Sequence, residues 1–251
     1  MKSIIYKIFR HLSRIFHNNK SLTIVTGASE SFYESLRDNL LHSIFKYENT
    51  ATLIVWDLGL SAEQLNELEL LLRDKGQIIH YPEENLSSHF SMKRHNYSFK
   101  SYCIYHSMCK CNTNYLLWLD AGCAIRKTLN AERNILKMYG FYSPYSSTSI
   151  GQLTYKDVKK YFFDNGYDYA NQQMLTGGVC GFDMKNHKIK SIVREWFLYT
   201  LNEQLISPVG ADLTNHRFDQ SLLSLIYYSH YSKVPFLARR LYDVRIHLNK
   251  K

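Results

Sequence analysis

Asp120 closes one of the most apolar stretches of the sequence, the run Tyr-Leu-Leu-Trp-Leu at 115–119. A carboxylate at the end of such a run lies where a buried strand leaves the hydrophobic core. There it can hold a divalent ion that neutralises phosphates. The alternative is a structural aspartate that begins a helix or closes a turn.

Two other apolar runs, 22–26 (LTIVT) and 53–57 (LIVWD), also end in residues that can meet a ligand. In open α/β sheets, ligands bind beyond the carboxyl ends of the strands, at a point where the strand order reverses. We therefore expect a small-residue turn and a second carboxylate at the same sheet edge as Asp120. The residues expected there are Thr26, Ala28, Ser29 and Asp57.

The elements that must position these residues alternate along the first half of the chain. Ser61 with Gln64 forms a capping-box pattern, which indicates the start of a helix. Strands alternating with helices predict an α/β domain with a mostly parallel central sheet and right-handed crossovers. The expected strands are 22–26, 53–57, 78–81 and 115–120; the expected helices are 36–45, 61–72, 99–111, 187–205 and 218–231; a long polar loop is expected over 82–98.

Composition excludes several classes of protein. The 251 residues are 45% hydrophobic and 21% charged, which is typical of one globular domain and not of a disordered or fibrous chain. No run approaches the roughly 18 apolar residues that a spanning helix needs. The five cysteines are an odd number without a secretion signal, so we expect reduced thiols in the cytoplasm.

The net charge of +9 is concentrated at the N-terminus, where no acidic residue precedes Glu30. Residues 1–20 are expected to form a basic amphipathic helix that associates peripherally with an anionic membrane surface. The alternative is an ordinary first helix packed on the body. No zinc-finger spacing or RNA-binding signature supports a nucleic-acid partner. The basic residues are Lys2, Lys7, Arg10, Arg14 and Lys20, and the apolar stripe is Ile4, Ile8, Leu12 and Ile15.

Two further patterns offer competing chemistry. The string 25–29 (VTGAS), with Tyr155 and Lys159, resembles short-chain dehydrogenases that use NAD(P). That family needs further glycines, and the bulk of Tyr33 would block backbone approach to a pyrophosphate. A His-Cys-Cys cluster is the second pattern, but no second ligand pair follows at zinc spacing, which favours a structural role. The cluster is His106, Cys109 and Cys111.

With these residues assembled, the chain resembles nucleotide-sugar glycosyltransferases of the GT-A fold, in particular the family-8-like group and a related uncharacterised domain of bacteria and nematodes. Five motifs agree in order between about residues 22 and 231. They are 56–65 (WDLGLSAEQL), 97–100 (YSFK), 117–125 (LWLDAGCAI), 175–182 (LTGGVCGF) and 216–223 (HRFDQSLL).

The resemblance implies transfer of a sugar from a nucleoside-diphosphate sugar, most often a UDP-sugar, to a glycan or lipid-linked acceptor in cell-surface polysaccharide synthesis. It implies a nucleotide-binding half at 21–125 and an acceptor-side half with a basic tail at 126–251. The expected donor contacts are Thr26, Ala28, Ser29, Asp57, Lys100, Asp120, Gly122 and Arg217; the catalytic group is Asp120, Asp219 and Gln220; the acceptor side includes Gly177 and Gly178.

The chain departs from the family pattern at the metal site. Gly122 stands where a second aspartate would follow Asp120, and the family's terminal histidine motif is absent, although His247 could replace its histidine. Two alternatives follow for the leaving diphosphate. Either Mn²⁺ or Mg²⁺ held by Asp120 and His247 neutralises it, or cations of the protein do. The missing aspartate also leaves open a catalytically silent glycan- or nucleotide-binding module.

Overall fold

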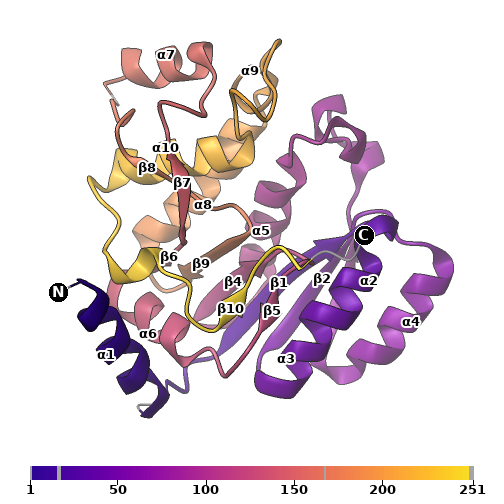
Figure 1. Ribbon diagram of the computed structural model, residues 1–251. Helices are drawn as coiled ribbons and strands as arrows, with labels where there is room; N and C mark the ends of the chain where they lie inside the picture. Colours follow the sequence, from indigo (N-terminus) through magenta and orange to yellow (C-terminus); the bar gives the residue numbers. More distant parts are fainter. Residues whose placement is uncertain (1, 16–17, 167, 249–251) are drawn as a thin grey trace.

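The computed structural model describes residues 2–15, 18–166 and 168–248. Its centre is a six-stranded sheet with the order β3-β2-β1-β4-β9-β6 (Figure 1). The first four neighbours run parallel, whereas β9 is antiparallel to both β4 and β6. The strands are β1 Leu22–Ala28, β2 Thr52–Asp57, β3 Gly76–His80, β4 Tyr115–Leu119, β6 Phe141–Tyr142 and β9 Val179–Asp183. The predicted α/β class with a mostly parallel sheet is confirmed.

The two central strands owe their position to their apolar sequences. Every residue of β1 and β4 is buried, as expected for strands covered on both faces. The register pairs Ala28 with Asp57 and Val25 with Trp118, so the carboxyl ends of β1, β2 and β4 meet at one edge. That edge is where the sequence places its candidate site.

Most of the expected helices are present, but the one expected over 187–205 ends at Thr200, and a separate short helix follows at 203–206. The helix at 130–139 falls outside the expected elements. Ser61 caps α4 with both hydrogen bonds of a capping box, which fixes the start of this helix. Between β1 and β2, the helical segment 33–47 contains a π-helical stretch. The longer helices are α1 Lys2–Ile15, α4 Ala62–Leu72, α5 Ser98–Lys110, α6 Asn130–Tyr139, α7 Lys156–Asp164, α8 His187–Thr200 and α10 Asp219–His230; the shorter ones are α2 Tyr33–Ser35, η2 Leu36–Leu41, α3 His42–Tyr47 and α9 Glu203–Ile206.

Two small sheets complete the second half of the chain. β7 (Tyr145–Ser149) pairs with β8 (Gln173–Leu175), and β10 (Val244–Arg245) pairs antiparallel with β5 (Ala124–Ile125). The β10–β5 pair returns the end of the chain to the loop after β4 (Figure 1). Single 3-10 turns occupy much of the connecting structure: η1 Glu30–Phe32, η3 Arg73–Lys75, η4 Glu83–Asn85, η5 Ser88–Phe90, η6 Met92–Arg94 and η7 Leu237–Arg239.

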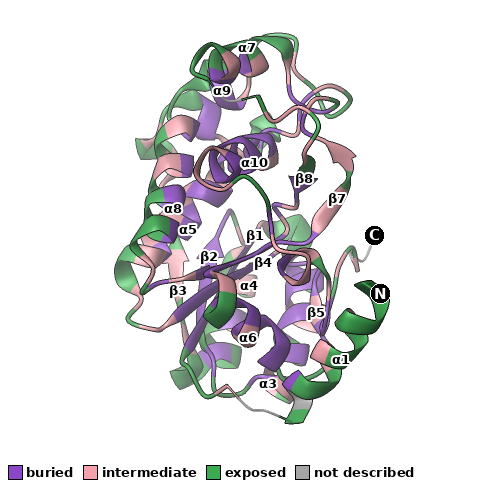
Figure 2. Cartoon of the chain, turned by 90° about the vertical axis from the view of Figure 1, so that its left-hand side faces the viewer, coloured by how far each residue is buried: buried purple, intermediate pink, exposed green. Residues whose placement is uncertain are grey.

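The N-terminal helix α1 packs beside α6 and the segment before β10, with much of its own surface exposed (Figure 2). No helix in the described part of the chain is long and apolar enough to cross a membrane. All five cysteines are free thiols, as the sequence analysis expects. His106, Cys109 and Cys111 belong to no candidate metal cluster among the described residues.

Candidate functional site

A cavity of about 890 Å³ opens at the carboxyl edge of β1 and β4, a volume suited to a nucleotide-sized ligand. Both halves of the chain line it. The expected site residues in its wall are Ala28, Ser29, Lys100, Asp120, Gly122, Gly177, Gly178, Arg217, Asp219, Gln220 and His247. The structure thus brings together most of the expected site residues, although Ala28 and His247 lie more than two hundred positions apart in the sequence.

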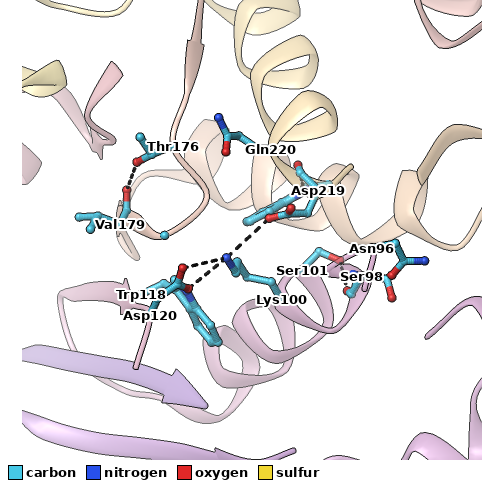
Figure 3. A network of polar contacts seen from close by, with 12 residues as sticks. Asn96, Ser98, Lys100, Ser101, Trp118, Asp120, Thr176, Val179, Asp219 and Gln220 are labelled. Carbon is cyan, nitrogen blue, oxygen red and sulfur yellow. Dashed lines mark hydrogen bonds and ion pairs between the residues drawn. The ribbon is translucent and has the colours of Figure 1, made fainter. Parts of the chain in front are cut away.

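The ammonium of Lys100 lies between two carboxylates at the floor of this cavity (Figure 3). Its Nζ is 3.0 Å from Oδ1 of Asp120 and 3.9 Å from Oδ2 of Asp219. The side chains of Lys100 and Asp219 are only 6% and 4% exposed, whereas that of Asp120 is 45% exposed. Asp120 therefore presents its carboxylate to the cavity, whereas the carboxylate of Asp219 is almost fully enclosed.

Burial and charge act in opposite directions on this trio. Burial alone would lower the pKa of Lys100, but the carboxylates of Asp120 and Asp219 outweigh it and raise that pKa. Lys100 is therefore a permanent cation. Burial raises the pKa of Asp219 to about 7, even though the charge of Lys100 opposes the rise. Its Oδ2 is buried and accepts no hydrogen bond from a described residue.

Glycines give the carboxylates their space. A Cβ atom at Gly177 would lie 2.6 Å from Oδ2 of Asp219, and one at Gly178 would lie 2.7 Å from Oδ2 of Asp120. Both distances are shorter than any ordinary contact, so a side chain at either position would displace a carboxylate. The Gly-Gly pair is required here by close approach.

Asp120 is held in place by its own strand and by the neighbouring one. The indole Nε1 of Trp118 donates to Oδ1 of Asp120 at 2.7 Å, and the Asp120 amide donates to the carbonyl of Gly178 at 3.0 Å. The rings of Trp118 and Tyr97 also lie 5.8 and 5.5 Å from the ammonium of Lys100. The carboxylate is thus oriented before any ligand arrives.

The cation of Arg217 lies in the part of the cavity wall that the second half of the chain forms. Arg217 immediately precedes α10, and its backbone amide is held by the carbonyl of Leu153 and the hydroxyl of Ser221. Its guanidinium makes no hydrogen bond or ion pair within the described part of the chain. Arg217 can therefore bind an anionic ligand without first losing a protein partner.

Backbone strain gathers around the cavity. Four non-glycine residues at or next to its wall have positive φ, a conformation that is uncommon for side chains larger than hydrogen. Such strain persists where surrounding structure imposes it, and it clusters at functional sites. The residues are His95 (52°), Tyr97 (57°), Phe218 (48°) and His247 (59°).

Two of the expected donor contacts do not line the cavity. Oδ1 of Asp57 accepts hydrogen bonds from the amides of Gly59 and Leu60, and Oδ2 lies 3.1 Å from Nδ1 of His80. Burial raises the pKa of Asp57, but these bonds outweigh it and lower the pKa overall. Asp57 closes the turn after β2. Thr26 is 1% exposed and lies outside the cavity wall, as expected within a strand that is covered on both faces.

The expected metal site is short of protein ligands. The β10–β5 pair and a hydrogen bond from the Leu248 amide to the Gly122 carbonyl bring His247 to the cavity. Asp120, however, is already engaged by Lys100 and Trp118, and Gly122 supplies no side chain. In the described part of the chain, no three His, Cys, Asp or Glu side chains gather closely enough to hold a metal. The residues present do not fit a protein-held divalent ion.

Sequence reasoning missed part of the wall. The sequence places the long loop 82–98 near a site but does not indicate which of its residues reach the cavity. In the sequence, Trp118 is predicted only as a core residue. The one signal for Tyr145 was its position in a polar stretch of the sequence that is rich in aromatic residues. The additional wall residues include Phe32, His95, Asn96, Tyr97, Trp118, Tyr145, Ser146, Leu213, Leu241 and Ile246.

This strand order, with the crevice at the carboxyl edge and Asp120 at the end of β4, defines the GT-A fold of nucleotide-sugar glycosyltransferases. The predicted fold is confirmed by solved structures. The galactosyltransferase LgtC, described in complex with donor and acceptor sugar analogues, is similar over 90% of this chain and 86% of its own, with 15% identity and a TM-score of 0.53. Placement in the family-8-like group stays a prediction.

A second similar structure is the apo form of the bifunctional glycosyltransferase WbbM, with 10% identity and a TM-score of 0.54 over 85% of this chain. The chain spans only 38% of the WbbM chain. The glycosyltransferase GlyE of Streptococcus pneumoniae TIGR4 has a TM-score of 0.50 and 13% identity over 84% of this chain, which spans 44% of GlyE. No protein-family model matches the sequence, and no curated protein sequence does.

Proposed function

We propose that this protein transfers a sugar from a nucleoside-diphosphate sugar to the hydroxyl of a glycan or lipid-linked acceptor, in cell-surface polysaccharide synthesis. The observation that carries the proposal is the Asp120–Lys100–Asp219 trio in the cavity wall, in which Lys100 and Asp219 are buried and Asp120 is half exposed. The similar structures add that this fold supports sugar transfer in other proteins. A UDP-sugar is the donor class that the sequence resemblance favours.

The donor would lie across the carboxyl edge of the sheet. Ala28 and Ser29 would line the nucleotide, and Phe32 offers an exposed ring to its base. The diphosphate would then lie toward Gly122 and the sugar toward the Gly177–Gly178 turn. Small residues on this path allow the backbone to approach the ligand closely.

Transfer breaks the bond between the anomeric carbon and the diphosphate oxygen and forms a bond from that carbon to the acceptor oxygen. The electron pair leaves with the diphosphate, so cations must stabilise it. The guanidinium of Arg217 has no partner among the described residues and can contribute its full charge, with His247 near Gly122 as a further donor. The acceptor proton must go to a base.

Asp219 is the best-placed residue for that base or for stabilising positive charge on the sugar. Its pKa of about 7 allows it to hold either protonation state at neutral pH. Gln220, the next residue in α10, adds an amide on the acceptor side of the cavity. The acceptor would enter past Tyr145 and Ser146.

The test is a panel of UDP-, GDP- and CMP-linked sugars, scored for hydrolysis and for transfer to short glycans, with and without Mn²⁺. Asp120→Asn is the matched variant, because it removes one negative charge and keeps the shape of the side chain. We expect transfer from one donor class and its loss in Asp120→Asn, with the unfolding temperature changed by only a few degrees. Donor binding without turnover would instead indicate a catalytically silent binding module.

We also propose that the protein works at the cytoplasmic face of a membrane, as a peripheral protein. The supporting observations are five reduced cysteines and a basic N-terminal segment without acidic residues. Such a location would give the enzyme access to lipid-linked acceptors.

A further inference from the structure

Helix α1 uses one face to dock on the body. The hydroxyl of Tyr6 donates to the carbonyl of Leu241 at 2.8 Å, and Arg10 pairs with Asp243 at 3.0 Å. The rings of Tyr6 and Phe9 pack 5.1 and 5.5 Å from the ring of Tyr242. These contacts fix the orientation of the helix about its own axis.

The adjacent face of α1 is aliphatic and open. At 3.6 residues per turn, its five aliphatic side chains fall within an arc of about 100°, next to the docked face. Large apolar side chains grouped in this way mark an interaction surface. They are Ile4 (61% exposed), Ile5 (44%), Ile8 (54%), Leu12 (43%) and Ile15 (57%), here called the α1 aliphatic face.

The surroundings of the α1 aliphatic face are basic. Lys7 and His11 lie on its far edge and are exposed. At the start of the helix, Lys2, Arg239 and Arg240 converge on the ring of Phe236 at 6.0, 5.6 and 4.7 Å. Arg10, the basic residue on the docked face, is paired with Asp243.

Acidic groups near α1 do not offset this charge. Asp243 has a side chain that is 2% exposed and paired with Arg10. Glu132 is buried, and burial raises its pKa to about 7, which reduces its negative charge. Apolar side chains bordered by exposed basic residues match an anionic lipid surface. The acyl region would take the apolar side chains and the headgroups would take the basic ones.

The segment on which α1 docks also lines the cavity. Leu241, whose carbonyl holds Tyr6, lines the cavity. Arg239 stacks 4.4 Å from the ring of Tyr145 and donates to its hydroxyl, and Tyr145 also lines the cavity. A bilayer in contact with α1 would therefore lie on the side of the molecule where Leu241 and Tyr145 line the cavity.

We infer that the α1 aliphatic face inserts into the interface of an anionic bilayer, and that the cavity takes an acceptor carried on a membrane lipid. The acceptor class rests on the proposed sugar transfer; the docking does not. Because α1 stays packed on the body through Tyr6, Phe9 and Arg10, docking places the catalytic cavity at a fixed position against the membrane.

The first experiment is cosedimentation of the full chain with phosphatidylcholine vesicles, with and without 30 mol% phosphatidylglycerol, a composition chosen at roughly the anionic content that attracts basic segments. Ile8→Ser combined with Leu12→Ser tests the aliphatic face. Leu70→Ser combined with Val209→Ser is the matched control, because these side chains are 72% and 97% exposed elsewhere. We expect binding only to anionic vesicles, weakened about tenfold or more in the α1 variant and unchanged in the control.

Three results would overturn the docking: no vesicle binding at low salt, equal binding by the α1 and control variants, or a stable dimer in sedimentation that the α1 variant abolishes. A dimer of this kind would mean that a second copy of the chain, and not a membrane, covers the α1 aliphatic face. The acceptor class is tested with a dodecyl glycoside in the same vesicles against the matching methyl glycoside. Equal transfer to both refutes the lipid-linked acceptor; transfer to neither refutes the proposed function and leaves the docking result standing.

Discussion

Lys100 and Asp120 form an ion pair of 3.0 Å between the first turn of α5 and the end of β4. The lysine is buried and the aspartate is half exposed, so the pair spans the boundary between the core and the cavity. A buried ammonium requires such a partner, because desolvation alone would neutralise it. The pair therefore fixes a charged carboxylate at the cavity floor.

Replacement of Lys100 by Met should abolish measurable transfer and lower the free energy of unfolding by about 2 kcal/mol, since two carboxylates lose their shared cation. The charge of Lys100 lowers the pKa of Asp219, so its removal should raise that pKa above 7. Steady-state kinetics and chemical denaturation measure the two effects. Lys100→Arg is the control: it keeps the charge and should keep part of the activity. Equal losses in both variants would point to packing instead of charge.

Asp219→Asn should lower kcat by orders of magnitude with little change in donor affinity, because a group that acts in the transition state affects rate more than binding. If the ionised carboxylate is the base, activity of the native chain should rise with pH through about 7. The Asn variant should lose this limb of the profile. A defect confined to donor Kd would reassign Asp219 to binding.

The raised pKa of Asp219 also predicts how the free energy of unfolding depends on pH. The folded chain holds the Asp219 proton up to about pH 7, whereas the unfolded chain releases it near its ordinary value of 3.8. The contribution of the protonated Asp219 to the free energy of unfolding is therefore complete below about pH 3.8. It is lost as pH rises toward 7, at up to about 1.4 kcal/mol per pH unit. Denaturation of native protein and Asp219→Asn at pH 5 and 8 measures the difference. Parallel pH dependence of the two proteins would show that Asp219 titrates normally.

Much of this arrangement could be predicted from sequence because it is local. The buried strands, the capping box at Ser61 and the position of Asp120 after an apolar run are all encoded within a few residues. Asp57 looked equivalent to Asp120, yet its carboxylate is used by the turn amides of Gly59 and Leu60. Whether an aspartate caps its own turn or faces a cavity depends on backbone geometry that strand patterns do not specify.

The partners of Lys100 could not be predicted in the same way. Asp219 lies more than a hundred residues away, and only the packing of α10 and α5 against α8 brings the two together. The sequence likewise left two interpretations of the N-terminal helix. In the structure, Tyr6 and Phe9 pack on the body while Ile4 and Ile8 stay exposed, and the membrane interpretation remains a prediction.

Gly177→Ala should move the carboxylate of Asp219, which its new Cβ would approach to 2.6 Å. We expect a loss of roughly ten- to a hundredfold in kcat, since misplacement of a catalytic group by about 1 Å has effects of this size. Ala28→Ser, on the nucleotide side of the cavity, is a control of similar added volume and should affect donor Kd more than kcat. An Ala variant with native kcat would show that the carboxylate has room to shift.

The last prediction concerns the metal. The expected protein ligands are Asp120 and His247, and Asp120 is already paired with Lys100. Mn²⁺ should therefore not bind the free protein detectably at about 1 mM, as measured by electron paramagnetic resonance. Chelation by EDTA should leave nucleotide affinity unchanged.

Gly122→Asp adds a carboxylate to Asp120 and His247 and should create measurable Mn²⁺ affinity; Gly122→Asn, without the charge, should create much less. Tight Mn²⁺ binding by the native chain, removed in His247→Ala, would contradict this prediction and restore the metal that the sequence resemblance implies.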